Sequence, residues 1–256
     1  MPNRDLEPPP GQDPEWDELY VARGNELPLF RPIYTGDIFS GVRVRTTTGR
    51  EKTRPVAVVQ HPCTMRSNGI LRESLLVARV HQFNPLPRDQ WHRNERLMPL
   101  PQLDPEKTSN QAHQAAFFEE LYLVHPDDLN PENRIACLSE IGSYLLLQRW
   151  MFHSSRLAVP TWQIAEANSH VYEEADLIEM WCEEAADQGV ALPEATTDAD
   201  DWLGEAVGDT TRRAMLRQVG LRSQVRREMK QEAKNRYQQA GEVIPMISPE
   251  GNRRST

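Results

Sequence analysis

The sequence predicts an α+β protein in which a β-rich segment is followed by a helical one. Between residues 30 and 125, apolar residues alternate or form short valine-rich runs, a pattern typical of strands. Between residues 126 and 240, they recur about every 3.6 residues, which is typical of helices. Because the two patterns are segregated along the chain, an α+β fold is favoured over an alternating α/β fold.

The two ends of the chain are expected to lie outside these folded segments. Residues 1–29 begin with a proline-rich stretch, and residues 241–256 are polar with two further prolines, so both are expected to be mostly disordered tails. A short helix over residues 15–22 is expected within the first tail, because Asp13 and Pro14 suit the N-cap and the first helical position.

In the β-rich segment, strands are expected at residues 37–45, 54–60, 74–83 and 115–124. The second of these reads RPVAVVQ, a nearly continuous apolar run that indicates a strand buried on both faces. The last, AAFFEELYLV, fits either a strand or one face of a helix, and its Phe, Tyr and Val residues favour a strand. Residues 84–105 hold five prolines and are expected to form an extended connection with a short turn.

In the helical segment, helices are expected at residues 131–156, 162–188, 198–208 and 210–239, the last with an interruption at Gly220 left open. Residues 212–236 carry nine cations and two acids, and their apolar residues form one narrow stripe. A basic amphipathic helix of this kind binds either nucleic acid or an acidic surface.

The net charge of −9, from 29 basic and 38 acidic residues, is unevenly divided along the chain. Residues 31–96 carry +7, residues 157–211 carry −14 without any Lys or Arg, and residues 212–256 carry +7. The overall charge therefore does not exclude nucleic acid as a partner of the β-rich segment. The acidic block 157–211 or the basic helix 212–236 is expected to bind a protein partner, or the two are expected to bind each other.

Composition excludes several other classes of protein. No apolar run approaches the ~20 residues that cross a bilayer, so no membrane contact is expected. Three cysteines at scattered positions are too few for a disulfide framework or a Cys-rich zinc site, and a reducing, cytoplasmic location is expected. The acidic residues show no metal-binding spacing, so we expect neither a metal nor a cofactor.

One stretch carries a more specific signal. It reads TGDIFSGVRVRTTTGREKTRPVAVVQHPCTMRSNG and is followed by SLLVARV. The order of a Gly-Asp-Ile strand, a basic loop, an Arg-Pro pair opening a valine-rich strand, and a third apolar strand resembles the PemK/MazF family of toxins. The resemblance covers about residues 35–81, under a third of the chain.

The resemblance implies a small SH3-like barrel over residues 30–125 and RNA cleavage without a metal. The arginine of the family's Arg-Pro pair is catalytic and corresponds to Arg54. A fixed guanidinium suits this role, because RNA transesterification builds negative charge on the phosphate oxygens. The family's loop between the first two strands contacts RNA, and here it holds Arg43, Arg45, Arg50 and Lys52. Family barrels are generally dimeric, which implies a homodimer.

The sequence departs from the family after the third strand. The family has a Thr or Ser there as a partner in proton transfer, whereas this chain reads Ala78-Arg79-Val80-His81. Imidazole is the usual proton carrier near neutral pH, so His81 is the candidate replacement and Arg79 a further site candidate.

His61 and Cys63 are also candidates, as a thiolate nucleophile with its base or as metal ligands. Pro62 disfavours the regular extended chain that would put both side chains on one face, so a turn-forming role is favoured.

Two functions stay open at this point. The first is an RNA-binding PemK/MazF-like protein with endoribonuclease activity centred on Arg54 and His81. The alternative is a non-enzymatic interaction or scaffold protein of a phage, defence or regulatory assembly, with a catalytically inactive barrel. The missing hydroxyl and the added helical segment favour the alternative, and the +7 charge of the β-rich segment favours the first.

Overall fold

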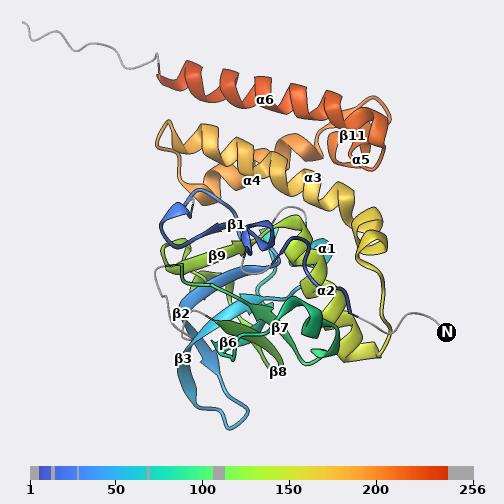
Figure 1. Ribbon diagram of the computed structural model, residues 1–256. Helices are drawn as coiled ribbons and strands as arrows, with labels where there is room; N and C mark the ends of the chain where they lie inside the picture. Colours follow the sequence, from blue (N-terminus) through green and yellow to red (C-terminus); the bar gives the residue numbers. More distant parts are fainter. Residues whose placement is uncertain (1–5, 13–14, 28, 68–69, 106–112, 242–256) are drawn as a thin grey trace, which may run out of the picture.

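The computed structural model describes residues 6–12, 15–27, 29–67, 70–105 and 113–241. It is a mixed α+β structure in which an antiparallel sheet is followed in sequence by helices (Figure 1). The expected α+β class is therefore confirmed. The expected disordered tail over 241–256 falls, beyond Gly241, outside the described residues.

A seven-stranded antiparallel sheet forms one layer of the molecule. Its strands follow the order β1 (Tyr20–Arg23), β9 (Arg134–Leu138), β2 (Asp37–Arg45), β3 (Glu51–Val58), β6 (Leu75–Gln82), β8 (Gln114–Val124) and β7 (Leu97–Leu100). Within the described residues β1 and β7 are edge strands, so the sheet is open. β2 also contacts β8, although β3 and β6 separate them in the sheet, which shows that this part of the sheet is curled.

The C-terminal part of strand β3 is buried on both faces, as its valine-rich run predicts. Val56 and Val58 pack in one cluster with Phe39, whereas Ala57 and Val59 pack in the other. The second cluster is covered by helix α2 (Glu140–Ser155) and the 3-10 helix η3 (Arg88–Arg93). Alternating side chains of one strand thus fill two separate apolar layers.

The sheet extends beyond the 30–125 segment expected for it. β1 lies within the expected N-terminal tail and β9 within the expected first helix. The helix expected at 15–22 is instead the 3-10 turn η1 (Asp17–Leu19) followed by β1, and α2 begins only at Glu140, after the N-cap Ser139. β9 forms a strand because it pairs on one side with β1 and on the other with β2, a tertiary effect that overrides the local helical pattern.

The described part of the N-terminal segment is packed rather than disordered. Leu6, Trp16 and Leu19 are at most 5% exposed. Trp16 stacks on Trp91, and the Arg88 guanidinium lies 4.2 Å from the Trp16 ring. Aromatic burial therefore holds a segment whose proline content suggested a tail.

The proline-rich connection of residues 84–105 contains two elements, η3 and β7. β7 includes Pro99, which an edge strand tolerates because one of its sides needs no ladder hydrogen bonds.

The remaining helices pack over one side of the sheet layer (Figure 1). They are α3 (Thr161–Ala186), α4 (Leu192–Gly204), α5 (Arg212–Met215) and α6 (Val219–Gly241). The rest of the chain also contains short elements of two to four residues, which are α1 (Pro62–Met65), β4 (Arg66–Ser67), β5 (Ile70–Leu71), η2 (Gly24–Glu26), η5 (Pro126–Asp128), η6 (Pro131–Asn133), β10 (Ala206–Val207) and β11 (Thr210–Thr211). The expected helix at 162–188 is close to α3. The expected 198–208 helix lies mostly within α4, and the expected 210–239 zone divides into α5 and α6 before Gly220.

The acidic block and the basic helix bind each other. Within the helical core, the apolar stripe of α6 is buried against α3 and α4. Around it, basic side chains of α5 and α6 meet carboxylates of α3 and α4 in the ion pairs Arg213–Glu174 (3.0 Å), Arg226–Glu173 (2.9 Å) and Arg236–Asp198 (3.5 Å). No helix in the described part of the chain is long and apolar enough to span a membrane.

Candidate functional site

The structure places Arg54 and His81 on neighbouring antiparallel strands, β3 and β6. Their ladder pairs Val58 with Val77 and ends at Val56 and Arg79. Arg54 lies two residues before Val56 in β3, and His81 lies two residues after Arg79 in β6, so both lie just beyond the last pair of this ladder. Val56 and Arg79 are paired and share a face, and alternate residues of a strand point to the same side, so Arg54 and His81 lie on one face of the sheet.

His81 is held from two sides by strand β8. Its ring stacks on Phe117, with centroids 3.8 Å apart and an interplanar angle of 8°. Its Nε2 lies 3.6 Å from Oε1 of Glu120, and its Nδ1 lies 3.2 Å from the Gln82 carbonyl oxygen. The imidazole is 35% exposed, so it is both positioned and accessible.

Glu120 connects His81 with Arg79. Its second carboxylate oxygen accepts a 2.6 Å hydrogen bond from Arg79 Nη1. The contact depends on an irregularity in the β6–β8 ladder, where Ala78 pairs with Leu121 but the adjacent Arg79 pairs with Phe117. The extra residues of β8 place Glu120 over the β6 side chains.

Arg54 differs from Arg79 in having no partner within the described part of the chain. Its side chain is partly buried and makes no ion pair or hydrogen bond to any residue that the structure describes. A guanidinium without a protein acceptor keeps all five of its donors for a ligand, and phosphate oxygens match its geometry.

The four cations expected to contact RNA lie on the β2–β3 hairpin, which projects from the sheet (Figure 1). Arg43 is already paired, since its Nε and Nη2 both donate to Asp128 at 3.1 and 2.8 Å. Arg45, Arg50 and Lys52 are exposed and have no ion-pair partner among the described residues. Lys52 lies two residues before Arg54 in β3 and so shares its face.

His61 and Cys63 come together, contrary to the expectation that Pro62 would separate them. Residues 62–65 form a helical turn with Pro62 at its first position and His61 as its N-cap. The Cys63 Sγ lies 2.8 Å from the His61 Nδ1. Burial lowers the pKa of His61. The pair lies beyond the C-terminal end of β3, away from Arg54.

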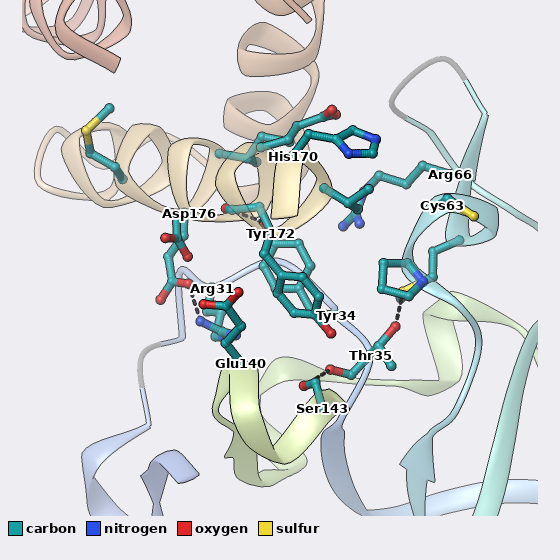
Figure 2. Close-up of a pocket in the computed structure, with 18 of the residues that line it drawn as sticks. Arg31, Tyr34, Thr35, Cys63, Arg66, Glu140, Ser143, His170, Tyr172 and Asp176 are labelled. Atoms are coloured by element: carbon teal, nitrogen blue, oxygen red, sulfur yellow. Dashed lines mark hydrogen bonds and ion pairs between the residues drawn. The ribbon is translucent and has the colours of Figure 1, made fainter. Parts of the chain in front are cut away.

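A cavity of about 630 Å³ lies between the sheet and helices α3, α5 and α6, and Cys63 is part of its lining (Figure 2). Arg31, Tyr34 and Arg66 reach into it from the sheet side, and His170 and Tyr172 from α3. Arg54 and His81 do not line this cavity. The molecule therefore has two separate candidate sites, one on the open face of β3 and β6 and one beneath α3.

Neither a scan against models of known protein families nor a search of curated proteins found a match to this chain. Among the described residues, no group of three or more His, Cys, Asp and Glu side chains is arranged to hold a metal ion.

Phe117 and Glu120 were not among the residues selected from the sequence. Both belong to the run AAFFEELYLV. Its two adjacent acidic residues, in an otherwise apolar strand, were the sequence feature that could have indicated a functional residue there. Their position beside His81 depends on the irregular register of β8, which no local pattern specifies.

Proposed function

We propose that this chain is a PemK/MazF-like RNA-binding protein that cleaves RNA without a metal. The observation that carries the proposal is the group formed on one sheet face by Arg54, Arg79, His81 and Glu120. It offers, on one face of the sheet, an accessible imidazole and a guanidinium that has no partner among the described residues, which are the two kinds of group that metal-independent transesterification needs.

The fold supports the proposal in outline. The three strands that carry the family resemblance, β2, β3 and β6, are consecutive neighbours in the sheet. With β8 they form its curled part, and we propose that this part is the counterpart of the family's SH3-like barrel. The helices after α2 would then be an addition to that unit.

In the proposed reaction the ribose 2′-hydroxyl attacks the adjacent phosphorus and the bond to the 5′-oxygen breaks. An Nδ1 proton donated to the Gln82 carbonyl leaves Nε2 as the His81 nitrogen that accepts or returns the proton. Arg54 answers the charge that develops on the non-bridging phosphate oxygens. The products are a 2′,3′-cyclic phosphate and a free 5′-hydroxyl.

His81 takes the place of the hydroxyl that this chain lacks after its third strand. A hydroxyl at position 78 or 80 would not reach RNA, because Ala78 and Val80 are 0% exposed and lie in the core cluster under α2. Arg79 and His81 alternate with them and face the other side.

Aromatic and basic side chains next to this group suit RNA. Phe117 and Phe83 are partly exposed, with ring centroids 6.1 Å apart, and unstacked bases bind to such rings. Lys52, Arg45 and Arg50 continue the positive charge along the hairpin.

The test is incubation of the full chain with mixed RNA in the presence of EDTA, with end-group analysis of the products. Arg54→Ala and His81→Ala should each reduce the single-turnover rate by about 100-fold or more. Arg227→Ala is the matched control, because Arg227 is an exposed cation on α6, outside the group. It should cleave at the wild-type rate.

Two results would overturn the proposal. Equal cleavage by wild type and Arg54→Ala would assign the activity to a different site or a contaminant. Absence of cleavage by the wild type, with all variants folded by circular dichroism, would rule out the enzyme and leave the non-enzymatic interaction protein as the function.

A further inference from the structure

Cys63 is exposed, whereas Cys137 and Cys182 are buried. Burial raises the pKa of the Cys137 thiol well above its usual range and that of Cys182 to about 11. Cysteine is among the most buried residue types, and a buried thiol of this kind is chemically inert. The chain therefore has two structural cysteines and one that solution reagents can reach.

The accessible thiol has a proton acceptor in contact. His61 Nδ1 lies 2.8 Å from Cys63 Sγ, and the turn that creates this contact is fixed by further hydrogen bonds. Thr64 Oγ1 donates to the His61 carbonyl at 2.9 Å and accepts from Gln60 Nε2 at 2.7 Å. An imidazole in this position can take up the thiol proton as a general base when the sulfur attacks.

The part of the cavity next to Cys63 is cationic. Figure 2 shows Arg66 and His170 at this end of the cavity. Arg213 and Arg217 also line the cavity, and Arg217 is close enough to His170 to lower the pKa of its imidazole. Arg213 is neutralised by Glu174 and Asp200. Neither Arg66 nor Arg217 forms an ion pair in the described part of the chain, and Arg66 interacts with Asp200 only through a longer-range electrostatic attraction.

Arg66 is held in place for a ligand. Its Nη2 donates to the Ile33 carbonyl at 3.0 Å, and its guanidinium lies 5.2 Å from the Tyr34 ring centroid. Its Nε is buried and has no hydrogen-bond partner among the described residues. A buried donor without an acceptor costs stability, and an anion in the cavity would supply one.

We propose that this end of the cavity is a thiol-modification site that takes a small disulfide carrying carboxylate groups. Arg66 and Arg217 bind the carboxylates, and Cys63 reacts with the disulfide. A volume of about 630 Å³ accommodates a molecule of this class. The inference does not depend on RNA cleavage.

The reaction is thiol–disulfide exchange. The Cys63 proton passes to His61, and the thiolate attacks one sulfur of the bound disulfide. A new S–S bond joins Cys63 to one half of the reagent, the original S–S bond breaks, and the other half leaves as a thiolate that takes the proton. One disulfide is consumed and one is formed, so no further oxidant is needed.

The experiment compares two disulfide probes on the full folded chain, the dianion 5,5′-dithiobis(2-nitrobenzoate) and the uncharged 4,4′-dithiodipyridine. The rate for each is divided by the rate for free N-acetylcysteine. We expect one rapid equivalent, absent in Cys63→Ser, and a normalised rate about tenfold or more higher for the dianion, falling as salt is added.

Variants separate the two parts of the site. Arg217→Gln, and Arg66→Gln where it folds, should reduce the advantage of the dianion without slowing the neutral probe. His61→Gln should slow both probes, and Arg227→Gln, which lies outside the cavity, should change neither. Equal normalised rates for the two probes, or a Cys63 that reacts no faster than N-acetylcysteine with either, would overturn the proposal.

Discussion

Arg79 on β6 donates a 2.6 Å hydrogen bond to Glu120 on β8, at the point where the ladder between these strands loses its regular register. The same carboxylate faces the His81 imidazole. Glu120 therefore pairs with Arg79 and orients His81, while Arg54 has no partner among the residues that the structure describes. This division leaves the four side chains with distinct roles in the proposed reaction.

Glu120→Gln tests that division. The amide keeps the shape of the side chain but removes the charge that orients His81, so we expect RNA cleavage to fall about tenfold or more. Stability should change by no more than about 1 kcal/mol, because Arg79 and Glu120 are 28% and 37% exposed. Glu119→Gln is the control, since among the described residues Glu119 makes only a surface contact with Arg96 at 3.5 Å. Single-turnover cleavage and urea unfolding measure the two effects, and a fall equal to that of Glu119→Gln would contradict the role.

Asp37 has a structural role within the Gly-Asp-Ile motif. Its carboxylate is buried, accepts a hydrogen bond from the Tyr34 backbone N–H at 3.0 Å, and lies 3.5 Å from the buried Arg134. Asp37→Asn removes the charge that faces this guanidinium and should cost about 3–5 kcal/mol in urea unfolding. Asp128→Asn, which breaks the exposed pair with Arg43, should cost about 1 kcal/mol or less. Similar losses for the two variants would show that Asp37 is not buried as described.

The order of strands around the resemblance could be predicted from local patterns, because the residues that specify it are close in sequence. The valine-rich run of β3 requires burial on both faces, and the structure provides it. Gly36 shows why the motif begins with glycine. Its φ is +88°, and a Cβ there would lie 2.9 Å from both Leu138 and Ser143.

The rest depends on contacts between residues far apart in the chain. β9 joins the sheet by pairing with β2, and β1 joins it by pairing with β9, although neither has a strong strand pattern of its own. Arg149 on α2 is fully buried, donates to the Glu7 carbonyl at 2.7 Å and lies over Trp91. Its burial requires the N-terminal segment, which sequence composition assigned to a tail. Charge alone could not decide whether the acidic block binds a partner or the basic helix.

Tyr237 joins three helices through its hydroxyl. The Trp181 Nε1 donates to it at 2.8 Å, and it donates to Asp198 at 2.9 Å. Tyr237→Phe should lower the free energy of unfolding by about 1–3 kcal/mol, because it leaves the buried indole N–H without an acceptor. Tyr122→Phe is the control, since the Tyr122 hydroxyl has no hydrogen bond to the described residues, and it should change stability by less than about 0.5 kcal/mol. Equal effects would show that the helical core does not depend on this link.

His170 predicts a dependence of stability on pH. Partial burial, with Arg217 and Arg222 nearby, lowers its pKa in the folded chain, and Glu174 only partly opposes this. In the unfolded chain the imidazole takes up a proton near its ordinary pKa of about 6.5, whereas the folded chain resists protonation. Falling pH therefore favours the unfolded state.

His170→Gln removes this effect and keeps a polar side chain. The free energy of unfolding of the variant, relative to wild type, should therefore rise as the pH falls from 7.5 to 5, because only the wild type loses stability through His170. Urea unfolding of both proteins at the two pH values measures the difference, and the remaining histidines cancel in the comparison. A difference that stays constant with pH would show that His170 has the same pKa in the folded and unfolded chain. That result would contradict its partial burial near Arg217 and Arg222.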